Sequence, residues 1–380
     1  MCYSLLQVWS KFLKKKDFFM KIPAFFAAVV FFSFPSFAQE VFENTALEER
    51  IFVENSYVPN YRELMRDITV AFSEFARRTN PDFKVLAFEG RDLLTQGQWE
   101  NDLEELHKAE LAGAKTEDER FLLKLFSTEE NIPVGMPNRR YLQALDGIVF
   151  ENLVCGGKAP SEETKKVLED NGITVFAVEH CRDEKSMRAG LAELEKKKIA
   201  AHADTDPDKK FDSVKSEEKL FMENQKNVLS LQDVRNLRVM KNSTDFASKG
   251  DWVDALAATN YDMIAVDPFF RFNRPLTKED VQRLKHKKLG AKRLVFAVLN
   301  ISLAEDTRPY WELTWKPKSP YWLRFPIADN PSAVMVDYWN TEWKRIIGVY
   351  FKEIVALGYD GVLLEGLDAH KTFERIIPIN

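Results

Sequence analysis

The sequence predicts an α/β fold of the (β/α)8 TIM-barrel class, formed by a single domain, and three observations carry this prediction. Eight short apolar runs recur along the chain, and amphipathic helical patterns separate them. The runs are almost continuously apolar, which is typical of parallel strands covered by helices. About 340 residues come after a leader segment, a normal length for an α/β barrel with insertions.

Each predicted strand is a short run bounded by turn or helix signals. The eight runs are Phe83–Phe88, Leu145–Phe150, Ile173–Val178, Ile199–Ala203, Leu237–Met240, Met263–Val266, Leu294–Asn300 and Gly361–Leu364. A ninth run, Ala333–Val336, is either an extra edge strand or part of a loop.

Amphipathic helices are predicted between these strands. Tyr61–Thr79 places Leu64, Ile68, Phe72 and Phe75 on one stripe, and Asn60 is a typical N-cap residue. The other predicted helices are Glu162–Asn171, Lys185–Lys197, Lys278–Leu289 and Trp343–Leu357.

The order of the elements is unusual, because the mature chain is expected to begin with a helix and to end with a strand. A barrel is a ring, so the opening helix can lie beside the closing strand in space. The order therefore predicts a circularly permuted barrel, and chain ends that lie close together make such a change physically cheap.

Two charged stretches interrupt the pattern, Thr95–Arg140 and Asp204–Asn227. Both are expected to be insertions. One interpretation is solvated surface helices and linkers, and the other is a lid over a site.

The first 38 residues read as a Sec-type signal peptide rather than part of the fold. Lysines 14–16 and Lys21 precede an apolar run, Ile22–Phe34, and a small-x-small pattern ends at Ala38. The run is about 13 residues, shorter than the roughly 20 needed for a spanning helix. Cleavage near Ala38 would leave a secreted or periplasmic barrel domain over residues 41–380.

Charge and cysteine usage narrow the functional classes. The formal net charge is −5 and acids and bases are interspersed, which does not favour a nucleic-acid surface. The protein is not expected to bind a membrane after cleavage of the leader. No cofactor is implied, and no metal is expected, because the five His show no metal-ligand spacing. Cys155 and Cys181 follow consecutive strands; they either form a disulfide in an oxidising compartment or remain thiols.

Acidic residues recur beside the predicted strand ends, where barrel enzymes place their reactive groups. They are Glu89, Glu151, Glu179, Asp204, Asp267, Glu305, Asp306, Glu365 and Asp368, and Asp337 follows the ninth run. Like charges on one rim raise some pKa values, which allows one carboxyl to act as an acid while another stays ionised. Two such groups are the minimum for glycoside hydrolysis. The alternative is that part of this set caps the following helices.

Aromatic residues cluster after the sixth and seventh predicted strands and around Asp337. Such rings either stack on sugars or pack a long loop onto the barrel. Trp311 and Tyr338 are the selected candidates for sugar binding. Arg308 could pair with a rim carboxylate or bind substrate.

Residues 260–370 carry a family resemblance. The segments "NYDMIAVDPFF", "NISLAEDTRPYWELTW" and "GYDGVLLEGLDAH" resemble the barrel of glycoside hydrolase family 114, related to endo-α-1,4-polygalactosaminidase. The earlier segments "PDFKVLAFEG" and "YLQALDGIVFENL" are similar to the part of the barrel that lies after these motifs in ordinary members, so the two halves stand in swapped order.

The resemblance implies a site by position. Asp267 matches the first strand-end acid, Glu305, Asp306 and Arg308 match the second segment, and Glu365 and Asp368 match the third. Glu151 matches a further family Glu. The chain departs from the family at four places: Ser302-Leu303 replaces Gly-Glu, Glu365 replaces Asp, Glu179-His180 replaces Asp-Tyr, and Phe88-Glu89 replaces Gln-Asn.

Two functions remain open. The first is a hydrolase for an extracellular polysaccharide such as an α-1,4-linked galactosamine polymer. Asp267 would be the ionised carboxylate and Glu365 or Glu305 the proton donor; the residues that would hold the sugar or tune the charge are Glu151, Asp306, Arg308, Asp337, Asp368, Trp311 and Tyr338. The second is a catalytically degenerate barrel that binds glycan in an exopolysaccharide system, which Leu303 and Glu365 motivate, because a carboxylate displaced by about 1 Å can cost about a hundredfold in rate.

Overall fold

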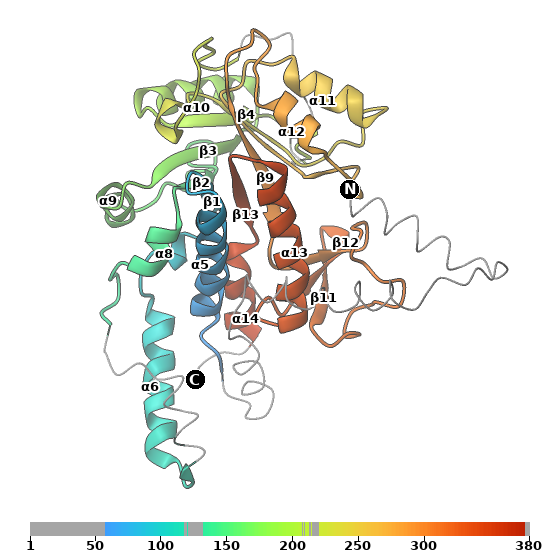
Figure 1. Ribbon diagram of the computed structural model, residues 1–380. Coiled ribbons are helices and arrows are strands. Elements are labelled where there is room, and N and C mark those ends of the chain that lie inside the picture. Colours follow the sequence, from blue (N-terminus) through green and yellow to red (C-terminus); the bar gives the residue numbers. More distant parts are fainter. Residues whose placement is uncertain are drawn as a thin grey trace, which may run out of the picture.

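A computed structural model describes residues 58–376, apart from 118, 119, 121–131, 207, 209, 213 and 215–219. Its centre is a sheet of eight parallel strands in the order β4-β3-β2-β1-β13-β9-β6-β5 (Figure 1). The strands are β1 Lys84–Phe88, β2 Gly147–Glu151, β3 Thr174–His180, β4 Ala200–Asp204, β5 Leu237–Met240, β6 Met263–Val266, β9 Leu294–Asn300 and β13 Gly361–Glu365. All eight predicted strands are confirmed, with bounds within two residues.

The sheet curls into a nearly closed barrel. Its two edge strands, β4 and β5, approach each other and share one parallel bridge, between Ala201 and Asn236. The predicted mixed α/β fold with a TIM-like barrel is therefore confirmed at this level.

Helices cover the outside of the barrel (Figure 1). They are α5 Tyr61–Thr79, α8 Arg139–Ala144, α9 Glu162–Asp170, α10 Glu184–Lys196, α11 Lys249–Ala257, α12 Lys278–Leu284 and α13 Thr341–Leu357. Helix α5 precedes β1 in the chain, yet it contacts α8 and α13, the helices that follow β1 and β9. It therefore occupies the position between β13 and β1 in the ring.

The insertion after β1 contains α6 Gln98–Gly113, which extends away from the barrel body, in agreement with the surface-helix interpretation. Three other features of the fold differ from the sequence-based expectation. The described chain does not end with a strand, because β13 is followed by a 3-10 turn, Leu367–Ala369, and by α14 His370–Ile376. The ninth run lies in β12 Asn330–Val336, the middle strand of an antiparallel sheet with β10 Leu303–Glu305 and β11 Leu323–Ile327. A two-stranded ribbon, β7 Phe269–Phe270 with β8 Arg274–Pro275, follows β6.

The core has an inner and an outer layer, because successive strand residues point to opposite faces. Leu86, Val149, Phe176, Val239 and Phe296 belong to the inner cluster, inside the barrel. Residues at alternate positions pack with the helices in the larger outer cluster. Burial on both faces explains why the strands are apolar throughout.

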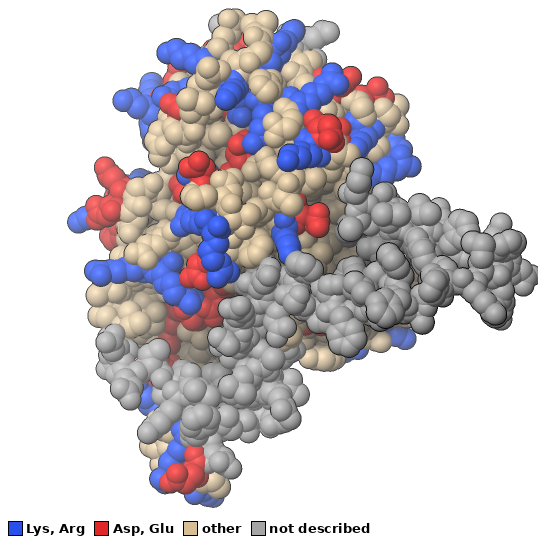
Figure 2. Space-filling view, viewed as in Figure 1, with Lys and Arg blue, Asp and Glu red and all other residues tan. Residues whose placement is uncertain are grey.

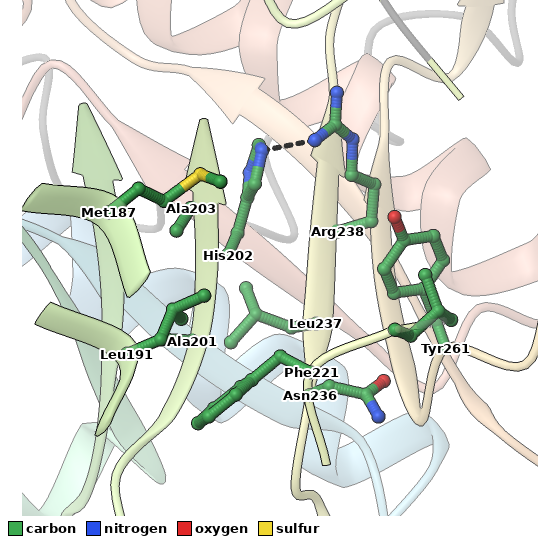
Figure 3. Close-up of a pocket in the computed structure, with 11 residues that line it drawn as sticks. Met187, Leu191, Ala201, His202, Ala203, Phe221, Asn236, Leu237, Arg238 and Tyr261 are labelled. Carbon is green, nitrogen blue, oxygen red and sulfur yellow. Dashed lines mark hydrogen bonds between the residues drawn. The ribbon is translucent and has the colours of Figure 1, made fainter. Parts of the chain in front are cut away.

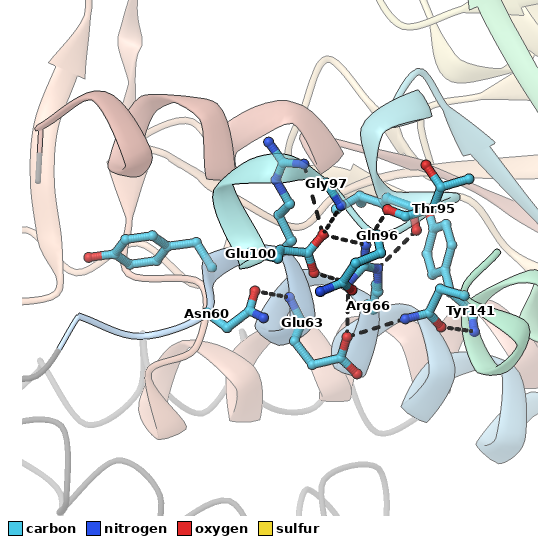
Figure 4. A network of polar contacts seen from close by, with 12 residues as sticks. Asn60, Glu63, Arg66, Thr95, Gln96, Gly97, Glu100 and Tyr141 are labelled. Atoms are coloured by element: carbon cyan, nitrogen blue, oxygen red, sulfur yellow. Dashed lines mark hydrogen bonds and ion pairs between the residues drawn. The ribbon is translucent and has the colours of Figure 1, made fainter. Parts of the chain in front are cut away.

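A buried ionic network anchors α6 to the barrel (Figure 4). Arg66 of α5 donates hydrogen bonds to both carboxylate oxygens of Glu100 and to the carbonyls of Leu93 and Thr95. Glu100 also accepts from the Gly97 N–H at the start of α6. The base of the projecting helix is thus fixed by a buried ion pair. Loss of either partner would leave the other charge buried and uncompensated.

Candidate functional site

Each barrel strand contributes one inward-pointing residue at its carboxyl end, and we call this set the carboxyl-end layer. Strand alternation continues the inner cluster to these positions. The eight residues are Phe88, Glu151, His180, Asp204, Lys241, Asp267, Asn300 and Glu365. Seven of them are polar, and four are carboxylates from four different strands.

Asp267 is held by a fork of two hydrogen bonds from Arg308. The Nη1 and Nη2 atoms of Arg308 donate to Oδ1 and Oδ2 of Asp267, each at 2.8 Å. The Nε of the same guanidinium donates to Glu305, at the end of β10. Burial opposes the charge, but Asp267 and Glu305 hold the pKa of Arg308 well above its ordinary value. The expectation that Arg308 pairs with a rim carboxylate is confirmed.

Glu365 pairs with a cation that the sequence prediction did not include. The Nζ of Lys241 donates to Oε1 of Glu365 at 2.9 Å, and it lies 4.3 Å from the centre of the Phe211 ring. The turn after Glu365 requires Gly366, whose φ of +85° is unfavourable for residues with a side chain. A Cβ at this position would also clash with Ser302 Oγ. This close packing fixes the backbone directly behind Glu365.

Glu151, His180 and Asp204 form a third group on three neighbouring strands. Nδ1 of His180 lies 2.8 Å from Asp204 Oδ1, and Nε2 lies 3.3 Å from Glu151 Oε1. Burial alone would lower the pKa of His180, but the two carboxylates outweigh it and raise that pKa to about 9. Burial would raise the pKa of Asp204, but its contacts with His180 and His202 lower that pKa.

The seam of the barrel lies between β4, which carries Asp204, and β5; Figure 3 shows the side chains that line it. A cavity of ≈ 110 Å³ opens there, lined by aliphatic side chains and by His202, Arg238, Asn236 and Tyr261. His202 Nδ1 accepts a 3.4 Å hydrogen bond from the Val239 N–H. The ring thus links β4 to β5 beyond their single backbone bridge. Burial and the neighbouring Arg238 lower the pKa of His202 to about 3.

A disulfide joins Cys155 and Cys181, with a Cα–Cα distance of 5.1 Å. This settles the alternative that the sequence left open. Buried Glu179 accepts hydrogen bonds from the backbone N–H groups of Val154 and Cys155, and its burial raises its pKa. The two sulfur atoms and this carboxylate lie within 4.8 Å of one another, but bonded sulfurs are not thiolate ligands for a metal.

The expected acidic rim is charge-compensated. Its carboxylates are bound by Arg308, Lys241 and His180, and Glu89 pairs with Arg91. Blue and red side chains are likewise mixed over the face in Figure 2. None of the strand-end acids is the N-cap of a described helix; those caps are mostly Asn, Ser or Thr, and the single acidic one is Asp183.

Several predicted sugar-binding residues lie away from the carboxyl-end layer. Tyr338 is fully buried and donates its hydroxyl hydrogen to the Tyr61 carbonyl, so its ring belongs to the core. Asp337 is buried and paired with Arg324 of β11. Asp368 follows Glu365 and pairs with Lys371. Asp306 is exposed beside Glu305, and Trp311 is half-buried against Trp315.

The sequence prediction missed Lys241, Asn300 and His202, and it included His180 only as a departure from the family. Lys241 directly follows a predicted strand, by the same rule that selected the acids. A search for polar residues of every kind at that position would have found it, because the position in the barrel matters more than the sign of the charge.

Comparison with known proteins yields relatives without an assigned activity. The chain is 29% identical over 157 residues to the uncharacterized protein MJ1477 of Methanocaldococcus jannaschii, covering 40% of this chain and 44% of that one. It is 29% identical over 123 residues to an uncharacterized protein of Deinococcus radiodurans, covering 32% and 38%. An uncharacterized protein of Thermotoga maritima is 36% identical over 73 residues, covering 19% and 23%.

The chain thus spans less than half the length of each of these relatives. No family model matches the sequence. Within the described residues, no helix has both the length and the apolar character required to cross a membrane.

Proposed function

We propose that this protein is an exported glycoside hydrolase that cleaves a polysaccharide by a two-carboxylate mechanism. One observation carries the proposal: Glu151, Asp204, Asp267 and Glu365, on four strands, turn inward at the carboxyl end of one barrel. Active sites of TIM-barrel enzymes lie at this end, and paired carboxylates are what glycoside hydrolysis requires. The resemblance to glycoside hydrolase family 114 supports the same reaction.

In this proposal Asp267 is the ionised carboxylate, acting as nucleophile or base. Its fork with Arg308 fixes both oxygens and stabilises the negative charge. Both candidate proton donors are bonded to a cation, and Glu365 is preferred because its partner, Lys241, is separate from the guanidinium that Glu305 shares with Asp267. Glu151 faces the layer from the other side and is 20% exposed, so it is available to a sugar hydroxyl or amino group.

An amino-sugar polymer, such as an α-1,4-linked galactosamine polymer, is the proposed substrate class. Carboxylates outnumber cations in the carboxyl-end layer when its two contacting residues, Glu305 of β10 and Arg308, are included. The carboxylates are Glu151, Asp204, Asp267, Glu305 and Glu365, and the cations are His180, Lys241 and Arg308. The remaining negative field would favour a cationic chain.

The test is a screen of the purified protein against amino-sugar and neutral polymers, with released reducing ends as the readout. Asp267→Asn and Glu365→Gln are each expected to lower kcat/KM by about 10²–10⁴-fold, the usual contribution of an acid–base or nucleophilic group. Glu169→Gln on the exposed face of α9 is the matched control and should retain full activity. Undiminished hydrolysis by both active-site variants would refute the assignment.

A second candidate is a non-hydrolytic glycan-binding barrel. The observation that favours it is that Asp267 and Glu365 are each already bonded to a cation. It predicts saturable binding of a polymer by calorimetry without release of reducing ends.

Export and the shifted start of the barrel are part of the proposal. The Cys155–Cys181 disulfide supports an oxidising compartment, in agreement with the predicted signal peptide, which lies outside the described residues. The position of α5 between α13 and α8 supports a circularly permuted single domain.

A further inference from the structure

Asp204, His180 and Glu151 form a continuous chain of contacts across β4, β3 and β2. His180 lies in the middle, with 6% of its side chain exposed, whereas the side chain of Glu151 is 20% exposed. His180 is therefore shielded from a polymer in the barrel mouth, and Glu151 is the member of the group that a substrate meets.

The groups that face His180 come from every neighbouring strand. Glu151 lies on β2, Asp204 and the buried His202 on β4, and Glu179 precedes it on β3. Lys241 lies beyond the Phe211 ring, whose centre is 5.2 Å from that of the imidazole in an edge-to-face arrangement. Asp204 is hydrogen-bonded to Nδ1 and Glu151 lies within ion-pair distance of Nε2, so a positively charged ring attracts both carboxylates.

The backbone around this chain is fixed by several independent contacts. The His180 N–H donates to Asn152 Oδ1 at 2.9 Å, and Asn152 itself has a left-handed φ of 60°, directly after Glu151. Glu179 accepts hydrogen bonds from the N–H groups of Val154 and Cys155, and the disulfide ties Cys155 to Cys181, the residue after His180. Such support holds a side chain within the narrow tolerance that catalysis requires.

We propose that His180 is a positioning residue of the same site: bound to Asp204, it carries the proton that holds Glu151 as a carboxylate in one orientation toward the substrate. This inference rests on the proposed hydrolase function. His180 itself does not touch substrate. It stands where the resemblance places a Tyr, so a charged, titrating group replaces a neutral one at this position of the chain.

The first experiment needs no substrate. The full chain contains five histidines, so labelling them with ¹⁵N gives few ring signals to follow through a pH titration by NMR. His180 is expected to stay doubly protonated at neutral pH and to titrate near pH 9. Asp204→Asn and Glu151→Gln should each move that titration toward lower pH. A neutral His180 at pH 7.5, or a titration that neither variant moves, would overturn the proposal.

The second experiment uses two isosteric variants on the polymer found to be cleaved. His180→Asn keeps a donor where Nδ1 meets Asp204 but loses the contact with Glu151, so kcat should fall about a hundredfold with little change in KM. His180→Gln keeps a neutral donor near Glu151, so it should recover part of kcat while the alkaline limb of the pH profile near 9 disappears. His286→Gln, on the exposed surface, is the control.

The two experiments separate the failures. If no polymer is cleaved, the hydrolase proposal fails, and the NMR titration still decides whether the Asp204–His180–Glu151 chain exists. If hydrolysis is found and His180→Asn leaves kcat and the pH profile unchanged, the positioning role is refuted while the hydrolase proposal stands.

Discussion

Carboxylates stand at both ends of the barrel, and the two ends use them differently. At the amino end, Asp146, Asp262 and Asp360 directly precede β2, β6 and β13. Each accepts a hydrogen bond from a backbone N–H on the neighbouring strand segment, of Val85, Arg235 and Val295 respectively, at 2.8 Å. Each also pairs with a Lys or Arg side chain.

At the carboxyl end, Asp267 and Glu365 are held by the tips of long cationic side chains, and Asp267 also accepts a hydrogen bond from the N–H of Phe269, two residues further along the chain. Arg308 lies 41 residues from Asp267, and Lys241 lies 124 residues from Glu365. Side-chain partners can move aside when a ligand arrives, whereas backbone N–H groups of a barrel strand cannot. The comparison teaches that the amino-end carboxylates fasten neighbouring strand segments of the sheet through the backbone, whereas Asp267 and Glu365 bind cations distant in sequence and, for Asp267, a local N–H two residues away.

The largest effect on stability is expected from Asp262, whose pair with Lys287 is fully buried. Asp262→Asn leaves the Lys287 ammonium buried without an anion, which should lower the free energy of unfolding by about 3–5 kcal/mol. Urea unfolding followed by Trp fluorescence measures the change. The control Asp254→Asn removes an exposed pair with Arg283 and should cost less than about 1 kcal/mol. Equal losses in the two variants would remove the distinction between the barrel ends.

The next effect concerns the disulfide beside the carboxyl-end layer. The double variant Cys155→Ser, Cys181→Ser should lose about 3 kcal/mol, because the bond closes a loop across a sequence separation of 26. The measurement is the urea midpoint with and without a reductant. Wild-type protein in reductant should match the variant, and a wild-type midpoint that resists full reduction would contradict the expectation.

The smallest stability effect is a pH dependence that comes from His180. Its pKa in the folded state, about 9, lies above the ordinary value of 6.5, so its contribution is complete below pH 6.5 and is lost as pH rises through 9. The loss should be about 1–3 kcal/mol. Unfolding free energies of wild type and His180→Asn, measured from pH 6 to pH 10, should converge at the alkaline end. Parallel curves would show that the ring does not titrate there.

The fold was more predictable than the site, for physical reasons. Strands such as Leu294–Asn300 are buried on both faces, so their apolar character is continuous and their bounds are visible in the sequence. β11, Leu323–Ile327, escaped prediction because its residues alternate in exposure within an aromatic loop. Helix α14 is short and mixed in composition, so no periodicity marks it.

The individual carboxylates of the site could be named from sequence, but their partners could not. The rule that reactive groups follow barrel strands located Asp267, Glu365 and Glu151. That Lys241 reaches Glu365 across the barrel, or that Tyr338 turns into the core, depends on which strands become neighbours and on side-chain direction. Neither is a local property of the chain. The rim was expected to be more acidic than it is, because the prediction counted the acids and not the cations that pair with them.

The placement of β13 has a consequence for how this chain reaches its native state. β13 pairs with β1 on one side and with β9 on the other, so residues 84 and 361 become neighbours. The ring cannot close until the segment beyond residue 360 has been synthesised. A sheet without β13 would leave the pairing edges of β1 and β9 unsatisfied, and contacts of such long sequence separation form slowly. A barrel that closes only at the end of synthesis delays folding of the chain. Such a delay would suit the proposed export, in which the chain crosses a membrane before it folds.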